Sequence, residues 1–155
     1  MYRVRQGINI LMVDDSAEDT FLVKRSLEKS GLRHLFHSVL DGTAAVAYLQ
    51  GKAPFSDREQ FPFPNILLCD LKMPQMDGYA LLRWLHAHPE CRVIPTIIFS
   101  SSSIEADIHE SYILGANAYI QKPASPDELG EIIHFLYHFW SRCQVPAPPR
   151  GHKCS

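Results

Sequence analysis

The chain has 155 residues, of which 46% are hydrophobic and 21% charged, and its formal net charge is −2. These values are ordinary for one globular domain that is large enough to bury a core. The charge balance excludes the strongly basic surface that nucleic-acid binding needs, and no apolar run is long enough to span a membrane.

The N-terminal sequence and the cysteines bear on the cellular compartment. Residues Met1–Arg5 lack the apolar stretch of a secretory signal. Cys69, Cys91, Cys143 and Cys154 do not follow the spacing of a disulfide framework or of a metal site. We therefore expect a cytoplasmic protein in a reducing environment, with Cys69 packed inside a strand.

The first half of the chain alternates strand and helix patterns. Ile8–Val13 is a nearly continuous apolar run, which is typical of a strand buried on both faces. A capping box at Ser16 begins the next helix, and a long loop with three prolines, Gly51–Pro64, later interrupts the alternation. The elements predicted here are a strand at Ile8–Val13, a helix from Ser16 to Leu27, a strand at Leu35–Val39, a helix at Thr43–Leu49 and a strand at Ile66–Cys69.

Start and stop signals delimit the elements of the second half. The residue before a proline avoids the helical region, so the third helix ends before His88-Pro89. Ser102 and Glu105 form a capping box for the fourth helix, and Ser125 is the N-cap of the last one. The elements predicted here are a helix at Tyr79–His86, a strand at Pro95–Phe99, a helix between Ser102 and Gly115, a strand at Ala118–Gln121 and a helix from Ser125 to Trp140.

This alternation predicts an α/β, flavodoxin-like fold. We expect a five-stranded parallel sheet in the order 2-1-3-4-5, with five helices covering its two faces. Residues 1–8 would lead into the domain, residues 8–144 would form it, and the proline-rich residues 145–155 would be disordered. In this topology the ligand crevice lies at the carboxyl ends of strands 1 and 3.

Polar residues follow four of the predicted strands: Asp14, Asp15, Asp70, Ser100 and Lys122. Because the carboxyl ends of parallel strands meet at one edge of the sheet, we expect these side chains to converge. Three carboxylates there would repel one another unless a cation neutralised them, and hard oxygen ligands in an open site suit Mg²⁺. Such a site can form an acyl phosphate on a carboxylate, with the cation, the lysine ammonium and the serine hydroxyl stabilising the phosphoryl oxygens.

These motifs give the chain a clear likeness: it resembles a response-regulator receiver domain of two-component signalling from Asn9 to Trp140. The strings that carry the resemblance are Ile10–Asp15, Leu68–Pro74 with Met76–Gly78, Ile98–Ser101 and Tyr119–Pro123. The resemblance implies that a sensor histidine kinase, or a phosphorelay, phosphorylates Asp70.

The resemblance also assigns roles to the residues around Asp70. It implies that Asp15 binds Mg²⁺ directly, that Asp14 binds it largely through water, and that the backbone carbonyl of Lys72 is a further ligand. It makes Ser100 and Tyr119 the pair of switch residues, which change position when Asp70 is phosphorylated. It also makes Lys122-Pro123 a candidate cis peptide bond.

A finer resemblance is to single-domain regulators partnered with bacteriophytochrome kinases. It is carried by Ser100–Ser102, Ser111-Tyr112, Ala118–Ile120 and Phe139-Trp140. It implies a sensor kinase, with a bacteriophytochrome as one candidate, and a homodimer.

The dimer face would join the fourth helix, the fifth strand and the last helix through Tyr112, Phe135 and Phe139. Phe135 and Phe139 lie off the centre of the last helix's apolar stripe. Packing under a neighbouring loop is the other interpretation for these two rings.

We expect a stand-alone phospho-switch that is not an enzyme beyond its own phosphorylation and dephosphorylation. Fifteen residues follow Trp140, too few for a DNA-binding module. A flavodoxin needs a neutral phosphate loop where Asp14–Asp19 stands, and an aspartate-based phosphohydrolase needs a second aspartate where Ser16 and Ala17 stand. The alternative left open is an interaction module on the same fold that does not use phosphate.

Overall fold

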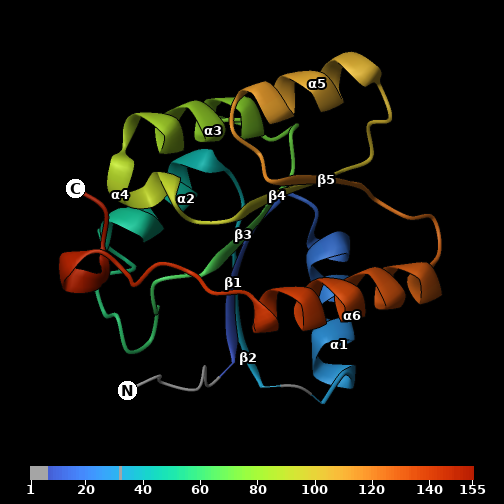
Figure 1. The fold of residues 1–155 in the computed structure, drawn as a ribbon, viewed down its shortest axis with the longest axis horizontal. Helices are drawn as coiled ribbons and strands as arrows, with labels where there is room; N and C mark the ends of the chain where they lie inside the picture. The colour runs from blue at the N-terminus through green and yellow to red at the C-terminus, as the bar shows by residue number, and fades with distance from the viewer. Residues whose placement is uncertain (1–6, 32) are drawn as a thin grey trace.

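The computed structural model describes residues 7–31 and 33–155, which form a parallel sheet with helices on both faces (Figure 1). The sheet has five strands in the order β2-β1-β3-β4-β5. The strands are β1 (Ile8–Val13), β2 (His34–Val39), β3 (Ile66–Cys69), β4 (Thr96–Ser100) and β5 (Ala118–Gln121). The predicted fold class and strand order are confirmed, and residues 1–6 of the expected lead-in lie outside the described residues.

Six α-helices occur in the described part of the chain, one more than the sequence predicts. They are α1 (Ala17–Lys29), α2 (Gly42–Gln50), α3 (Gly78–Ala87), α4 (Pro89–Arg92), α5 (Glu105–Ile113) and α6 (Pro126–Arg142). The additional helix, α4, is a single turn that begins at Pro89, because proline fits the first position of a helix as well as it stops the preceding one. None of the described helices is both long and apolar enough to cross a membrane.

The start of α5 differs from the predicted capping box. The helix begins at Glu105 with Ile104 as its N-cap residue, and no side chain caps it. The Ser102 hydroxyl instead accepts a hydrogen bond from the backbone N–H of Ile104 and donates one to Asp107 at 2.5 Å. Ser102 therefore forms a turn ahead of the helix, which leaves its hydroxyl bound to the first turn of α5.

The sheet divides the core into two layers, because successive side chains of a strand point to opposite faces. Leu11, Leu67 and Ile98 face the layer covered by α2, α3 and α4. Ile10 and Leu68 face the layer covered by α1 and α6, and Figure 1 shows these two helices side by side on their own face of the sheet. All five of these strand residues are at most 3% exposed. The strands therefore form a well-packed base for the residues at their carboxyl ends.

The long loop between α2 and β3 is held by one arginine. The Arg58 guanidinium donates hydrogen bonds to the backbone carbonyls of Tyr48 (2.6 Å), Leu49 (3.1 Å) and Phe61 (3.1 Å). The ring of Phe55 packs edge-on against Phe61, with centroids 5.3 Å apart. The loop is therefore a packed extension of the core, despite its prolines and charges.

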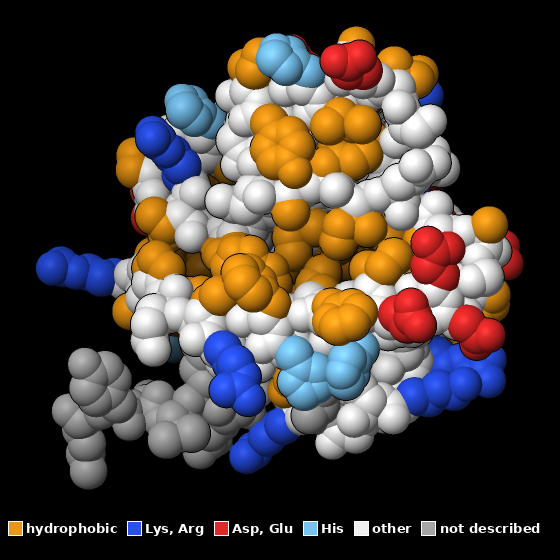
Figure 2. All heavy atoms as spheres, turned by 45° about the vertical axis from the view of Figure 1, so that its right-hand side comes forward, with side chains coloured by type: hydrophobic (Ala, Val, Ile, Leu, Met, Phe, Trp, Pro, Cys, Tyr) orange, Lys and Arg blue, Asp and Glu red, His pale blue; other side chains and the backbone are white. Residues whose placement is uncertain are grey.

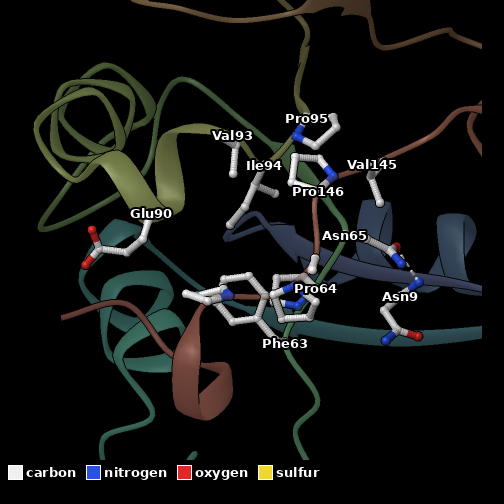
Figure 3. Close-up of a pocket in the computed structure, with 13 residues that line it drawn as sticks. Asn9, Phe63, Pro64, Asn65, Glu90, Val93, Ile94, Pro95, Val145 and Pro146 are labelled. Atoms are coloured by element: carbon white, nitrogen blue, oxygen red, sulfur yellow. Dashed lines mark hydrogen bonds between the residues drawn. The ribbon is translucent and has the colours of Figure 1, made fainter.

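The C-terminal segment folds back on the domain, whereas the sequence predicts disorder from residue 145 onward. Residues 145–149 line a cavity of about 320 Å³ at the amino ends of β3 and β4 (Figure 3). Cys154 is buried and donates its backbone N–H to the carbonyl of Leu49 at 2.8 Å. The segment contains one short 3-10 helix, η1 (Arg150–His152), and its prolines did not prevent packing.

The same segment is joined to α4 by a disulfide. Cys91 and Cys154 are bonded across a Cα–Cα distance of 6.0 Å. The expectation of four reduced cysteines is wrong for this pair in the structure, because the fold brings together residues 63 positions apart, which spacing alone does not reveal. The other two cysteines are free: Cys69 is buried in β3 as predicted, and Cys143 lies partly exposed at the end of α6.

Replacing Cys154 with serine should release the C-terminal segment while the sheet stays folded. We expect faster amide hydrogen exchange in residues 145–155 and a loss of about 2–4 kcal/mol in the free energy of unfolding, because the cross-link no longer restricts the unfolded chain. Cys143→Ser is the matched control, since Cys143 is free. Equal exchange in the two variants would contradict the anchoring role of the disulfide.

Candidate functional site

Three carboxylates meet at the carboxyl ends of the two central strands. Val13 of β1 pairs with Cys69 of β3, so Asp14 and Asp70 follow two directly paired residues. One carboxylate oxygen each from Asp14, Asp15 and Asp70 lies within 4.8 Å of the others. Asp14 is 1% exposed and Asp70 is 8% exposed, whereas Asp15 is on the surface. The structure thus brings together the acidic residues that the sequence predicts to converge.

Lys122 points its ammonium into this acidic cluster. Its backbone N–H donates to the carbonyl of Ser100 at 2.7 Å, which fixes where the side chain leaves the end of β5. Its Nζ lies 2.8 Å from Asp14 Oδ2 and 3.2 Å from Asp70 Oδ2. A further carboxylate oxygen, Asp19 Oδ2, is 2.8 Å away. Burial lowers the pKa of Lys122, but the contacts with Asp14 and Asp19 raise it more, so the pKa is above its ordinary value and the amine is charged.

Asp14 has an oxygen that suits a metal ion. Its Oδ1 accepts a hydrogen bond from the backbone N–H of Ser16 at 2.9 Å. Its Oδ2 is buried and accepts no well-directed hydrogen bond, although the charge of Lys122 is 2.8 Å away. Burial raises the pKa of Asp14 above its ordinary value, and the contact with Lys122 opposes this. A hard, buried oxygen with free lone pairs beside two more carboxylates fits a divalent cation such as Mg²⁺.

Asp70 is held by the loop that follows it. Its Oδ1 accepts a hydrogen bond from the backbone N–H of Leu71 at 2.7 Å, and the N–H of Gly78 bonds to the carbonyl of Leu71 at 2.9 Å. Gly78 approaches so closely that a Cβ there would overlap the backbone carbonyl of Asp70. The glycine is therefore required for the loop to close against the end of β3. Lys72 in this loop is exposed, and its backbone carbonyl stays a predicted metal ligand.

Ser100 and Tyr119 are linked through the turn after β4. Ser100 is buried, and its hydroxyl accepts a hydrogen bond from the backbone N–H of Ser102 at 3.2 Å. The Tyr119 hydroxyl donates to the carbonyl of Ser102 at 2.8 Å. The two predicted switch residues thus hold the same short segment from its two sides.

The sequence missed two residues that extend this link. The carboxylate of Asp107 accepts hydrogen bonds from the hydroxyls of Ser102 (2.5 Å) and Tyr79 (2.8 Å). These two bonds lower the pKa of Asp107 below its ordinary value. Asp107 stands in the first turn of α5, where an acidic residue is unremarkable, so no local signal distinguished it. These two hydrogen bonds form a continuous link from α3 through Asp107 of α5 to the turn between β4 and α5.

The predicted cis peptide bond at Lys122-Pro123 is not present. In the described residues the cis peptide is Ala53-Pro54, in the loop after α2. Lys122 reaches Asp70 with a trans bond before Pro123, so the contacts of this site do not require the cis isomer.

The geometry agrees with the comparisons to known proteins. Residues 10–134 match the response regulator receiver domain family. This chain belongs to that family. A receiver-domain response regulator is not a conventional enzyme.

Similar receivers include Rcp1 and two proteins whose structures are described in terms of phytochrome or red light signalling. Response regulator Rcp1 of Synechocystis sp. is 34% identical over 131 residues, which cover 84% of this chain and 87% of Rcp1. The structure of the phosphorylated cyanobacterial phytochrome response regulator RcpA has a TM-score of 0.83 at 31% identity, covering 91% of this chain and 99% of RcpA. RPA3017, of red light signalling in R. palustris, has a TM-score of 0.84 at 31% identity, covering 90% of this chain and 99% of its own.

A metal-bound relative bears on the acidic cluster. The Mn²⁺-bound form of Rcp1 has a TM-score of 0.80 at 33% identity, covering 90% of this chain and 99% of that structure. The three converging carboxylates of this receiver form the acidic metal site typical of the family.

Replacing Gly78 with alanine should destabilise the receiver by about 1–3 kcal/mol, because the new methyl group overlaps the backbone carbonyl of Asp70. The change is read from urea unfolding curves. The matched control is Gly130→Ala on α6, where a Cβ meets nothing within 4 Å. That variant should be stabilised by up to about 1 kcal/mol, because alanine favours the helix. Similar losses in both variants would contradict the close approach at Gly78.

Proposed function

We propose that Asp70 accepts a phosphoryl group from a sensor histidine kinase, directly or through a phosphorelay. The observation that carries the proposal is the position of Lys122, whose ammonium lies 3.2 Å from the carboxylate of Asp70 inside a cluster of three acids. A positive charge at that distance can hold the oxygens of a phosphoryl group on Asp70.

The proposed transfer needs a carboxylate nucleophile and little further chemistry. An oxygen of Asp70 bonds to phosphorus while the bond from phosphorus to the donor's imidazole nitrogen breaks, which leaves an acyl phosphate on this chain. Asp14, Asp15, Asp70 and the Lys72 carbonyl would hold Mg²⁺, which supplies charge neutralisation for the phosphoryl oxygens. The burial of Asp14 and Asp70 strengthens these charge interactions, because less water screens them.

We propose that Ser100 and Tyr119 turn phosphorylation into a change of surface. The Ser100 hydroxyl would move toward the phosphoryl group, and Tyr119 would fill the space that Ser100 leaves. The hydrogen bonds of Ser102 to Tyr119 and Asp107 support this proposal, because displacing the turn after β4 must alter both. The phosphoryl group biases the two arrangements only by making better contacts in one of them.

The names of the relatives favour a light-sensing kinase as the partner. Rcp1 is a response regulator, RcpA is a phytochrome response regulator, and RPA3017 belongs to red light signalling. We propose that a bacteriophytochrome phosphorylates this chain in the cytoplasm.

Incubation with acetyl phosphate and Mg²⁺ should add the mass of one phosphoryl group to the protein, as measured by intact-mass spectrometry. Asp70→Asn should add none, because the amide is not a nucleophile, whereas the exposed Asp127→Asn control should behave like the wild type. A gain in Asp70→Asn would refute the assignment of the acceptor. No gain in the wild type would favour the phosphate-independent interaction module.

A second proposal concerns the face formed by α5, β5 and α6. Figure 2 shows hydrophobic side chains gathered over these elements, with a hollow between the two helices. Phe135 and Phe139 are 70% and 63% exposed, so they do not pack under a loop, and Tyr112 and Ile113 on α5 are also exposed. We propose that this face forms a homodimer, because one helix does not need so wide an apolar surface for its own packing.

Truncating Phe135 and Phe139 together to alanine should raise the dimer dissociation constant by about tenfold or more, because exposed aromatic side chains are typical anchors of an interface. Sedimentation velocity over a concentration series measures this change. Phe21→Ala is the control, since Phe21 is 62% exposed and belongs to α1, which is not one of the three elements of this face. A dimer that persists unchanged in the double variant would place the interface elsewhere.

A further inference from the structure

Asp19 is an acidic residue next to the site that the function assigned above does not use. It stands on the first turn of α1, where its backbone N–H donates to the capping hydroxyl of Ser16 at 3.2 Å. Its carboxylate lies 2.8 Å from the ammonium of Lys122, although the two residues are 103 positions apart. A helix N-terminus favours an acidic side chain at this position, so the location of Asp19 on α1 is compatible with its contact to Lys122.

Asp19 is not part of the metal cluster. The metal cluster consists of Asp14, Asp15 and Asp70, each of which has one carboxylate oxygen within 4.8 Å of the other two. Asp19 contacts Lys122 from the side of α1, and its side chain is 33% exposed. A cation held by the cluster therefore does not need Asp19 as a ligand, and the ion pair of Asp19 is with Lys122.

Lys122 divides its ammonium among three acids at unequal distances. The distances to Asp14 and Asp19 are both 2.8 Å, and the distance to Asp70 is 3.2 Å. A phosphoryl group on Asp70 adds negative charge and new oxygen acceptors that also need this ammonium. An ammonium has three protons, and Lys122 already contacts three acids, so one phosphoryl contact can replace the contact to Asp70. A second contact to the phosphoryl group competes with the contact to Asp19.

We propose that Asp19 is a positioning residue that draws Lys122 toward α1 in the unphosphorylated receiver and lowers the affinity of the site for a phosphoryl group. The proposal rests on the function proposed above, because it concerns the same lysine. The ion pair between Asp19 and Lys122 must weaken before the lysine ammonium can make all its contacts with the phosphoryl oxygens. Asp19 thereby makes the phosphorylation of Asp70 slightly less favourable.

The effect is modest, because water reaches the Asp19 carboxylate. A partly exposed ion pair contributes little to an equilibrium, so removing it should change the affinity for a phosphoryl mimic by about two- to fivefold. The change should shrink at high salt, because the pair is partly screened already.

The test is the binding of beryllofluoride, a phosphoryl mimic, in the presence of saturating Mg²⁺. The wild type, Asp19→Asn and Glu18→Gln are titrated, and the amide signals of Ser100 and Tyr119 are followed by NMR. Glu18 is the matched control, because it is an acidic residue on the same helical turn and makes no ion pair with Lys122. A separate Mg²⁺ titration without beryllofluoride measures the metal affinity of each variant.

We expect Asp19→Asn to bind beryllofluoride about two- to fivefold more tightly than the wild type, with a Mg²⁺ affinity that stays within about twofold. Glu18→Gln should match the wild type in both titrations. Asp19→Ser, which keeps a small polar residue on the first turn, repeats the measurement if the asparagine variant does not fold.

Three results would overturn the inference. Equal or weaker beryllofluoride binding in the Asp19 variants would mean that Asp19 does not restrain Lys122. An equal gain in Glu18→Gln would assign the effect to net charge, and a gain matched by a change in Mg²⁺ affinity would assign it to the metal. A wild type that binds Mg²⁺ but no beryllofluoride would instead refute the proposed function, so the two failures are distinguishable.

Discussion

The structure depends on the attraction between one ammonium and a group of crowded carboxylates. Asp14 and Asp70 are almost excluded from water at the ends of β1 and β3, where their charges repel each other unless positive charge lies beside them. Lys122 supplies that charge from β5, which is two strands away from β3. The strand order, the buried strands and the glycine that lets the loop close behind Asp70 all serve to bring these charges within reach of one another. The same crowding is what suits the cluster to the cation and the phosphoryl group proposed for it.

The site is connected to the surface by a few hydrogen bonds rather than by the core. The turn after β4 is held by Ser100 on one side and by Tyr119 and Asp107 on the other. Tyr79 ties the same group to α3. These residues lie next to α5, whose exposed apolar residues form part of the face proposed for dimerisation. A change at the end of β4 therefore has a short physical route to that face, since one turn carries bonds to both.

Strong local patterns made much of the fold predictable. The continuous apolar run of β1 and the polar residues directly after it identified both a buried strand and the edge where Asp14 would lie. The N-cap of α6 was equally clear, and Ser125 accepts the expected hydrogen bond from Glu128. The predicted start of α5 was wrong because the Ser102 hydroxyl had two possible partners, the helix N-terminus and Asp107. Only the tertiary fold decides between them. The Asp19–Lys122 ion pair and the Cys91–Cys154 disulfide could not be predicted for a related reason. Each joins residues that are far apart in the sequence and whose neighbouring residues give no signal of the contact.

The state of the four cysteines has a practical consequence for biophysical work on this receiver. Cys69 is enclosed in the core, and Cys91 and Cys154 are bonded to each other, so Cys143 at the end of α6 is the accessible thiol of the oxidised chain. It lies one turn beyond Phe139, whose backbone carbonyl accepts a hydrogen bond from the Cys143 thiol, with sulfur and oxygen 3.3 Å apart. A maleimide fluorophore or nitroxide added to the unaltered protein would therefore attach at a single position beside the exposed aromatic residues, giving a native spectroscopic reporter of that surface without engineered cysteines.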